Sequence, residues 1–149
     1  MKLEGDKNLP GKPADIFHRL LDPEMLARCI KGCENLEALE STSDGPRLYL
    51  ARVRVGIGLV KGSFKANVSL SEIEAPSGYT IAVTARSVVG SATGTARVTL
   101  ASHDERTHLK WHADTRVSGI IAAVGQRVLG AAAKRFTDTF FERLAAEVE

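Results

Sequence analysis

The sequence predicts one soluble α+β domain in which a curved antiparallel sheet wraps a long C-terminal helix. Apolar and polar residues alternate at period two in residues 1–9 and through most of residues 49–117, which is typical of strands with one buried face. Over residues 120–148 apolar residues recur at every fourth position, which is typical of an amphipathic helix. The 149 residues contain no repeat and no linker, so we expect residues 1–149 to form a single domain.

Turn and helix signals place the remaining elements. Pro10 and Gly11 end the first strand. Pro13 suits the first turn of a helix over residues 12–21, and Asp22-Pro23 ends that helix and begins a second short one. Consecutive strands then follow, with alternating stretches at residues 49–55, 64–70, 79–85, 96–100 and 109–117. About six to seven strands bury their apolar faces together only by folding around the terminal helix, which is the helix-grip arrangement.

Composition narrows the location and the partners. A formal net charge of +2 without a basic stretch argues against nucleic acid as a partner. No apolar run approaches the roughly 20 residues that cross a bilayer. Lys2, Glu4, Asp6 and Lys7 interrupt the N-terminus, unlike a signal peptide. We therefore expect a cytoplasmic protein.

The residues that could bind a metal are few and scattered. Cys29 and Cys33 have no further ligand nearby in sequence, and cytosolic thiols stay reduced, so they are interpreted as packing residues. His108 and His112 lie on a predicted strand, roughly 13 Å apart, and cannot share one ion. The prediction is no metal site and no covalently bound cofactor.

The inward faces of the sheet and helix form the candidate ligand site. Their side chains are apolar, and the helix carries several glycines and alanines that leave volume against the sheet. We expect an apolar small molecule there, although dense packing is the ordinary fate of such residues. The predicted lining comprises Val53, Val55, Phe64, Ala66, Val68, Ile81, Val83, Ala96, Val98, Trp111, Val128, Leu129, Ala132 and Phe136.

Two apolar segments are candidates for contact with a membrane or a partner. The turn at residues 56–60 has a Gly-Ile-Gly pattern, but a strand follows it, so it is no dinucleotide fingerprint. An exposed tip there would suit lipid or a partner, and folding onto the cavity mouth is the equal alternative. The predicted contact residues are Ile57, Leu59, Val60, Ile120 and Ile121.

No catalytic constellation is evident. The stretch around Ser91 has alanine where a nucleophile elbow has its central residue. Tyr49 and Tyr79 are almost the only titratable groups on the inward faces. The prediction is a protein that is not an enzyme.

Several stretches together carry a family resemblance that runs from end to end. They are Leu3-Glu4-Gly5, Asp22-Pro23-Glu24, residues 29–34, residues 53–56, residues 61–64, residues 125–127, residues 131–134 and Phe140-Phe141. In combination they resemble the CoxG family, the G subunits of carbon monoxide dehydrogenase, within the START-like (SRPBCC) and birch-allergen-like superfamily. Lys31 departs from the proline expected before Gly32.

The resemblance implies an accessory protein of molybdenum-hydroxylase carbon monoxide dehydrogenases at the inner face of the cell membrane. There it would recruit the enzyme or carry its quinone electron acceptor. The resemblance leaves two alternatives open, a membrane-tethering adaptor without a ligand and a polyketide cyclase-like enzyme, because a fold alone does not decide function.

Overall fold

The computed structural model describes residues 1–40 and 45–149. The elements follow in the predicted order, with two short helices after the first strand. Their bounds are β1 (Lys2–Leu9), α1 (Pro13–Leu21), α2 (Pro23–Cys29), β2 (Cys33–Ala38), β3 (Arg47–Ile57), β4 (Val60–Glu74), β5 (Gly78–Ser87), β6 (Gly90–His103), β7 (Arg106–Ser118), the 3-10 helix η1 (Ile120–Val124) and α3 (Gln126–Val148).

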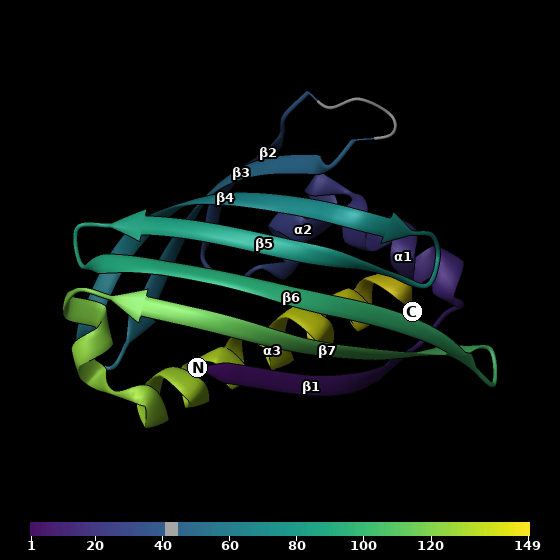
Figure 1. The fold of residues 1–149 in the computed structure, drawn as a ribbon. Helices are drawn as coiled ribbons and strands as arrows, with labels where there is room; N and C mark the ends of the chain where they lie inside the picture. Colours follow the sequence, from purple (N-terminus) through teal and green to yellow (C-terminus); the bar gives the residue numbers. More distant parts are fainter. Residues whose placement is uncertain (41–44) are drawn as a thin grey trace.

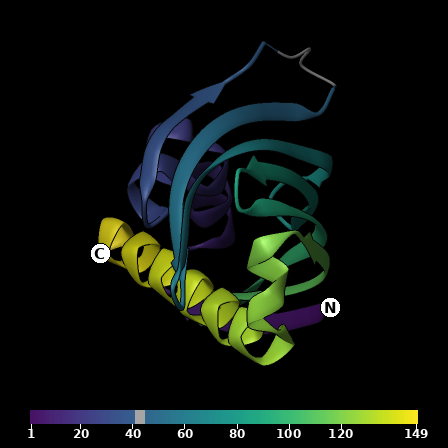
Figure 2. The ribbon, with the colours of Figure 1, turned by 90° about the vertical axis from the view of Figure 1, so that its left-hand side faces the viewer.

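The strands form one antiparallel sheet in the order β1-β7-β6-β5-β4-β3-β2. Strands β2 to β7 pair with their sequence neighbours, and β1 joins β7 at one edge. The sheet curves, and α3 runs along its concave side (Figures 1 and 2). The helix-grip prediction is therefore confirmed.

Helices α1 and α2 pack at one end of the sheet. Pro13 and Pro23 each occupy the first turn of a helix, and Asp22 Oδ1 accepts a hydrogen bond of 3.0 Å from the Glu24 backbone N–H. This cap satisfies one of the free donors at the start of α2. The inner side of α1 buries Ile16 and Phe17 in the core.

The terminal helix begins later than the sequence predicted. Residues 120–124 form η1, and glycines with positive φ flank it, Gly119 at 88° and Gly125 at 93°. Because L residues with side chains rarely adopt these angles, the two glycines turn the chain before α3 begins. The expected helix over residues 120–148 is therefore wrong in its first six residues.

The buried apolar side chains form two clusters at opposite ends of the concave face. The large core cluster joins α1, α2 and the end of α3 to the sheet, and the small core cluster lies near η1. The large cluster comprises Leu9, Ile16, Phe17, Leu20, Met25, Cys29, Tyr49, Leu70, Tyr79, Val98, Leu100, Leu109, Phe141 and Leu144. The small cluster comprises Phe64, Ile121 and Leu129.

Alanine substitutions at two glycines should have opposite effects on stability. At Gly130, in the interior of α3, an added Cβ meets no atom within 4 Å, whereas at Gly32 (φ +83°) it would overlap the carbonyl oxygen of Arg54. Alanine is a better helix former by about 1 kcal/mol. We expect Gly130→Ala to raise the free energy of unfolding by about that amount in urea titrations.

Gly32→Ala is the matched control, because it makes the same chemical change where the backbone and the space oppose it. It should lower the free energy of unfolding. A loss of stability in Gly130→Ala would mean that the space beside Gly130 is occupied.

Candidate functional site

The strand register places the predicted sheet lining on one face. Val53 lies opposite Phe64, Val68 opposite Val83, and Ile81 opposite Ala96. Cross-strand partners point to the same side of a sheet, and this side is concave, where α3 lies (Figure 2). The structure therefore brings the ten predicted sheet residues to one surface. Their role in binding stays a prediction.

The middle of the concave face is less well filled than its ends. Val53, Val83 and Ala96 point inward but belong to neither core cluster, and all three are only half-buried. Small side chains dominate there, including a continuous cross-strand row formed by Ala51, Ala66, Ala85 and Ala92. Interiors normally pack at crystal-like density, so the half-buried state of these apolar residues means that neighbouring side chains cover them only in part.

Helix α3 contributes unevenly to this surface. Leu129 is buried, and Ala132 is half-buried. Phe136 lies one turn before the half-buried Phe140, which packs on the large core cluster, yet its side chain remains 40% exposed. At Phe136, therefore, neighbouring apolar side chains cover the ring only in part.

The prediction for Val128 needs correction. It is 38% exposed, beside the buried Leu129. An α-helix has 3.6 residues per turn, so positions that recur by exactly four drift around the axis. The four-residue pattern therefore cannot keep Val128 on the same face as Phe140.

A groove of about 500 Å³ separates the edge strand β1 from the first half of α3. Leu3, Gly5 and Trp111 line its sheet side, and Gly130 and Ala133 line its helix side. A Cβ on Gly5 would lie 3.0 Å from the indole ring of Trp111. Glycine at this position therefore lets the indole lie against the β1 backbone.

An ion pair crosses the same groove. Lys7 Nζ lies 2.8 Å from Asp138 Oδ1, and Lys134 Nζ lies 2.8 Å from Asp138 Oδ2. Hydrogen bonds from Lys134 and Lys7 hold the pKa of Asp138 below its usual value. Lys7 occupies an inner position of β1, in phase with Leu3 and Gly5 and opposite Leu109. Its place in the sequence pattern alone indicated no role.

Both tyrosines are buried in the large core cluster. The Tyr49 hydroxyl donates a hydrogen bond of 2.6 Å to the backbone carbonyl of Leu21. Burial raises the pKa of both Tyr49 and Tyr79, and both belong to the large core cluster. In this geometry the Tyr49 proton points to the backbone.

The predicted contact residues divide into exposed and buried ones. Leu59 is 100% exposed and Ile120 is 62% exposed. Ile57 and Val60 pack on the small core cluster, and Ile121 belongs to it at 5% exposure. Ile121 is therefore wrong as a surface contact.

Sequence reasoning missed Val88, which is 96% exposed in the β5–β6 turn. This turn adjoins both other apolar segments. The Ile121 N–H donates to the Val89 carbonyl at 2.8 Å, and a Cβ on Gly62 would meet Val89 Cγ2 at 2.8 Å. Leu59, Val88 and Ile120 therefore project from neighbouring segments at one end of the molecule, which we call the apolar end.

The convex face near this end is basic. Arg52 lies opposite Lys65 and Lys65 opposite Arg86, and all three are exposed. Residues 52–65, 84–93 and 115–128 contain seven Lys or Arg and no Asp or Glu, so the rest of the chain carries a formal −5. Glu34 lies nearby and bonds to Ser63. Like charges directly opposite each other on neighbouring strands are destabilising. These three residues are distant in sequence and come together only because β3, β4 and β5 pair in this register.

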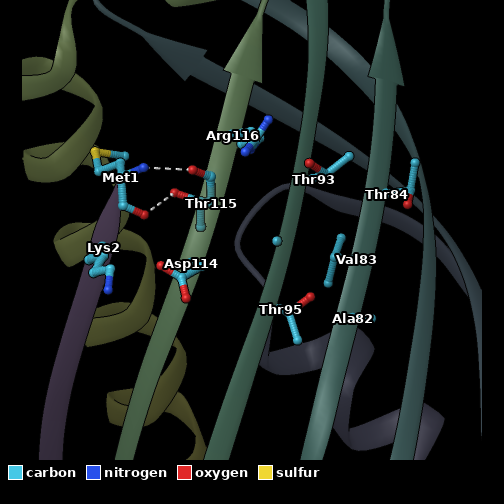
Figure 3. A pocket seen from close by; sticks show the side chains of 11 residues that line it. Met1, Lys2, Ala82, Val83, Thr84, Thr93, Thr95, Asp114, Thr115 and Arg116 are labelled. Carbon is cyan, nitrogen blue, oxygen red and sulfur yellow. Dashed lines mark hydrogen bonds between the residues drawn. The ribbon is translucent and has the colours of Figure 1, made fainter.

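A second hollow, of about 520 Å³, lies over β1, β7, β6 and β5 (Figure 3). Its rim is mostly hydroxyl and charged side chains, with Asp114 and Arg116 at one side. Met1 closes part of it, because its amino group donates a hydrogen bond of 2.7 Å to the Thr115 carbonyl. Most of this lining is polar, but Val83, one of the residues predicted to line the apolar site, also contributes to it.

The metal-ligating side chains of residues 1–40 and 45–149 are dispersed. No cluster of three His, Cys, Asp or Glu could hold a metal there. His112 is exposed, and His108 contacts Asp6 at 3.2 Å. Cys29 and Cys33 are free thiols whose pKa values are raised by burial. None of the described helices is long and apolar enough to cross a membrane.

Solved structures with the same fold match nearly the whole chain. A conserved protein from Geobacillus kaustophilus is 31% identical, with a TM-score of 0.90, and the match covers 99% of this chain and 95% of that one. Ara h 8.0201 matches at 14% identity and a TM-score of 0.73, over 99% and 97% of the two chains. The ZhuI aromatase/cyclase from Streptomyces sp. R1128 matches at 14% identity and a TM-score of 0.68, and the match covers 99% of this chain and 93% of that one.

Comparison with curated proteins gave no match. The family model that describes the G subunit of carbon monoxide dehydrogenase (CoxG) matches residues 5–149. That match covers β1 from Gly5 onward, the other six strands, both short helices and α3, and it includes the apolar end. The chain therefore belongs to the CoxG family of carbon monoxide dehydrogenase G subunits.

Proposed function

We propose that this chain is an accessory protein that binds a quinone or similar lipid-like molecule between its sheet and α3. In this role it serves a carbon monoxide dehydrogenase-type molybdenum hydroxylase at a membrane surface. The observation that carries the binding proposal is the half-buried apolar surface between two packed clusters. Apolar concave surfaces with few polar groups are typical of sites for small apolar molecules.

Trp111 supplies a polar group suited to such a ligand. Its indole N–H donates no hydrogen bond to any residue that the structure describes. The ring lies on the concave face and lines the groove. An indole N–H is a donor only, so it matches a carbonyl oxygen, which a quinone carries at each end of its ring.

The membrane part of the proposal is supported by the apolar end. Leu59, Val88 and Ile120 project where basic residues outnumber acidic ones. Apolar side chains that enter the headgroup region, together with nearby Lys and Arg, give reversible binding to anionic lipids. The partner enzyme is proposed from the family description alone.

Two other functions remain as alternatives. The apolar end alone would support an adaptor that tethers an enzyme to the membrane without a ligand. The likeness to an aromatase/cyclase raises the second, an enzyme acting on a polycyclic substrate. The hydrogen bond from Tyr49 to the backbone argues against Tyr49 as its acid.

A bulky side chain on the concave face should weaken binding. In Ala96→Phe, the new ring would project from β6 onto the concave face, and we expect the affinity for a short-chain benzoquinone to fall at least about tenfold. Quenching of Trp111 fluorescence, from the only tryptophan, measures this affinity.

Thr95→Phe is the control, because Thr95 is exposed on the opposite face of β6. Its affinity should stay within about twofold of the unmodified protein. Equal losses in both variants, or none in Ala96→Phe, would exclude the concave face as the site.

Negative charges introduced at the apolar end should weaken membrane binding. We expect Leu59→Asp and Val88→Asp each to reduce flotation with anionic liposomes severalfold, because a carboxylate opposes both burial in lipid and approach to anionic headgroups.

Leu48→Asp is the control, since Leu48 is also an exposed leucine but lies at the other end of β3. It should float like the unmodified protein. If Leu59→Asp floats equally well, the apolar end is not the membrane contact.

A further inference from the structure

We infer that the groove between β1 and α3 is the entry for the ligand, and that the Lys7–Asp138 ion pair is a latch that closes it. This inference rests on the proposed function, because it concerns the route to the same concave surface. It adds a moving part, the first half of α3, and a residue pair that controls the rate of exchange.

The two halves of α3 are held very differently. In the second half, Phe141 and Leu144 are buried in the large core cluster. Arg28 Nε lies 3.1 Å from Glu147 Oε1, and the Arg143 side chain donates to the Arg28 carbonyl. This half is fixed to α2 by packing and by polar contacts.

The first half has few attachments. Leu129 is its buried anchor, in the small core cluster. Among the described residues, the Lys7–Asp138 pair is the one polar contact that joins residues 126–138 to another element. Gly119 and Gly125, both with positive φ, precede this half. Segments with few buried contacts open at low free-energy cost.

Opening this half would uncover the right surface. The groove has Leu3 and Trp111 on the strand side, and Gly130 faces open space on the helix side. Phe136, already 40% exposed, lies between Gly130 and Asp138 along the helix. The groove begins at Lys2, and the preceding residue, Met1, packs on the small core cluster beside η1, so this end of the groove lies near the apolar end. A ligand leaving a membrane there would reach the concave face without crossing the polar convex face.

The latch is weak enough to break reversibly. Both side chains are partly exposed, and exposed ion pairs contribute only modestly to stability. Lys134 also holds Asp138, which positions the carboxylate toward Lys7. If the pair is intact in both the empty and the loaded closed forms, breaking it should speed entry and release equally.

The test is stopped-flow quenching of Trp111 fluorescence by a benzoquinone with a ten-carbon tail. We expect Lys7→Met and Asp138→Asn each to raise the association and dissociation rates by about two- to fivefold, with an unchanged dissociation constant. Salt should accelerate exchange in the unmodified protein and have little effect in Lys7→Met, because salt screens exposed charges.

Glu147→Gln is the matched control, because it removes the Arg28–Glu147 pair in the fixed half of α3. Its rates should equal those of the unmodified protein. Gly130→Phe should slow association by narrowing the groove.

The outcomes separate the latch from the proposed function. If the probe binds but its rates are the same in Lys7→Met, Asp138→Asn and the unmodified protein, the latch is wrong and the binding function stands. Equal acceleration in Glu147→Gln would also overturn it, because general loosening of α3 would then explain the rates. If the probe does not bind the unmodified protein, the proposed function fails, and the latch fails with it.

Discussion

The architecture depends on one constraint, the need of a curved sheet to cover an apolar concave face that it cannot cover by itself. Seven strands present this face, and α3 lies along it (Figure 2). Side chains fill the two ends, where α1, α2 and η1 add further apolar groups. The middle carries Ala96, Val83 and Gly94 and receives no such addition. The same constraint thus builds the core and leaves apolar residues in the middle of the concave face only partly covered.

Most of the fold could be predicted from the sequence because its strands keep a strict period of two and its turns carry Pro and Gly. In residues 64–70 and 79–85, for example, every second residue is apolar. The start of α3 could not be predicted, because Ile120 and Val124 fit a helical period while Gly119 and Gly125 take left-handed backbone angles. Apolar spacing does not report such angles.

The candidate site was predictable in its sheet half and less so in its helix half. Alternation alone assigned Val53 and Ala96 to the inner face, whereas a step of four residues misplaced Val128 on α3. The Lys7–Asp138 pair and the basic row of Arg52, Lys65 and Arg86 join residues distant in sequence. Such features depend on strand register and helix placement, which a single sequence does not specify.

The central claim is that the space between sheet and helix holds an apolar molecule. Native mass spectrometry of protein purified from a quinone-containing host, followed by organic extraction, tests it most directly. The account predicts a stoichiometric quinone or isoprenoid lipid that is lost in Ala96→Phe. A protein of bare chain mass that still floats with liposomes would contradict the claim and favour the adaptor.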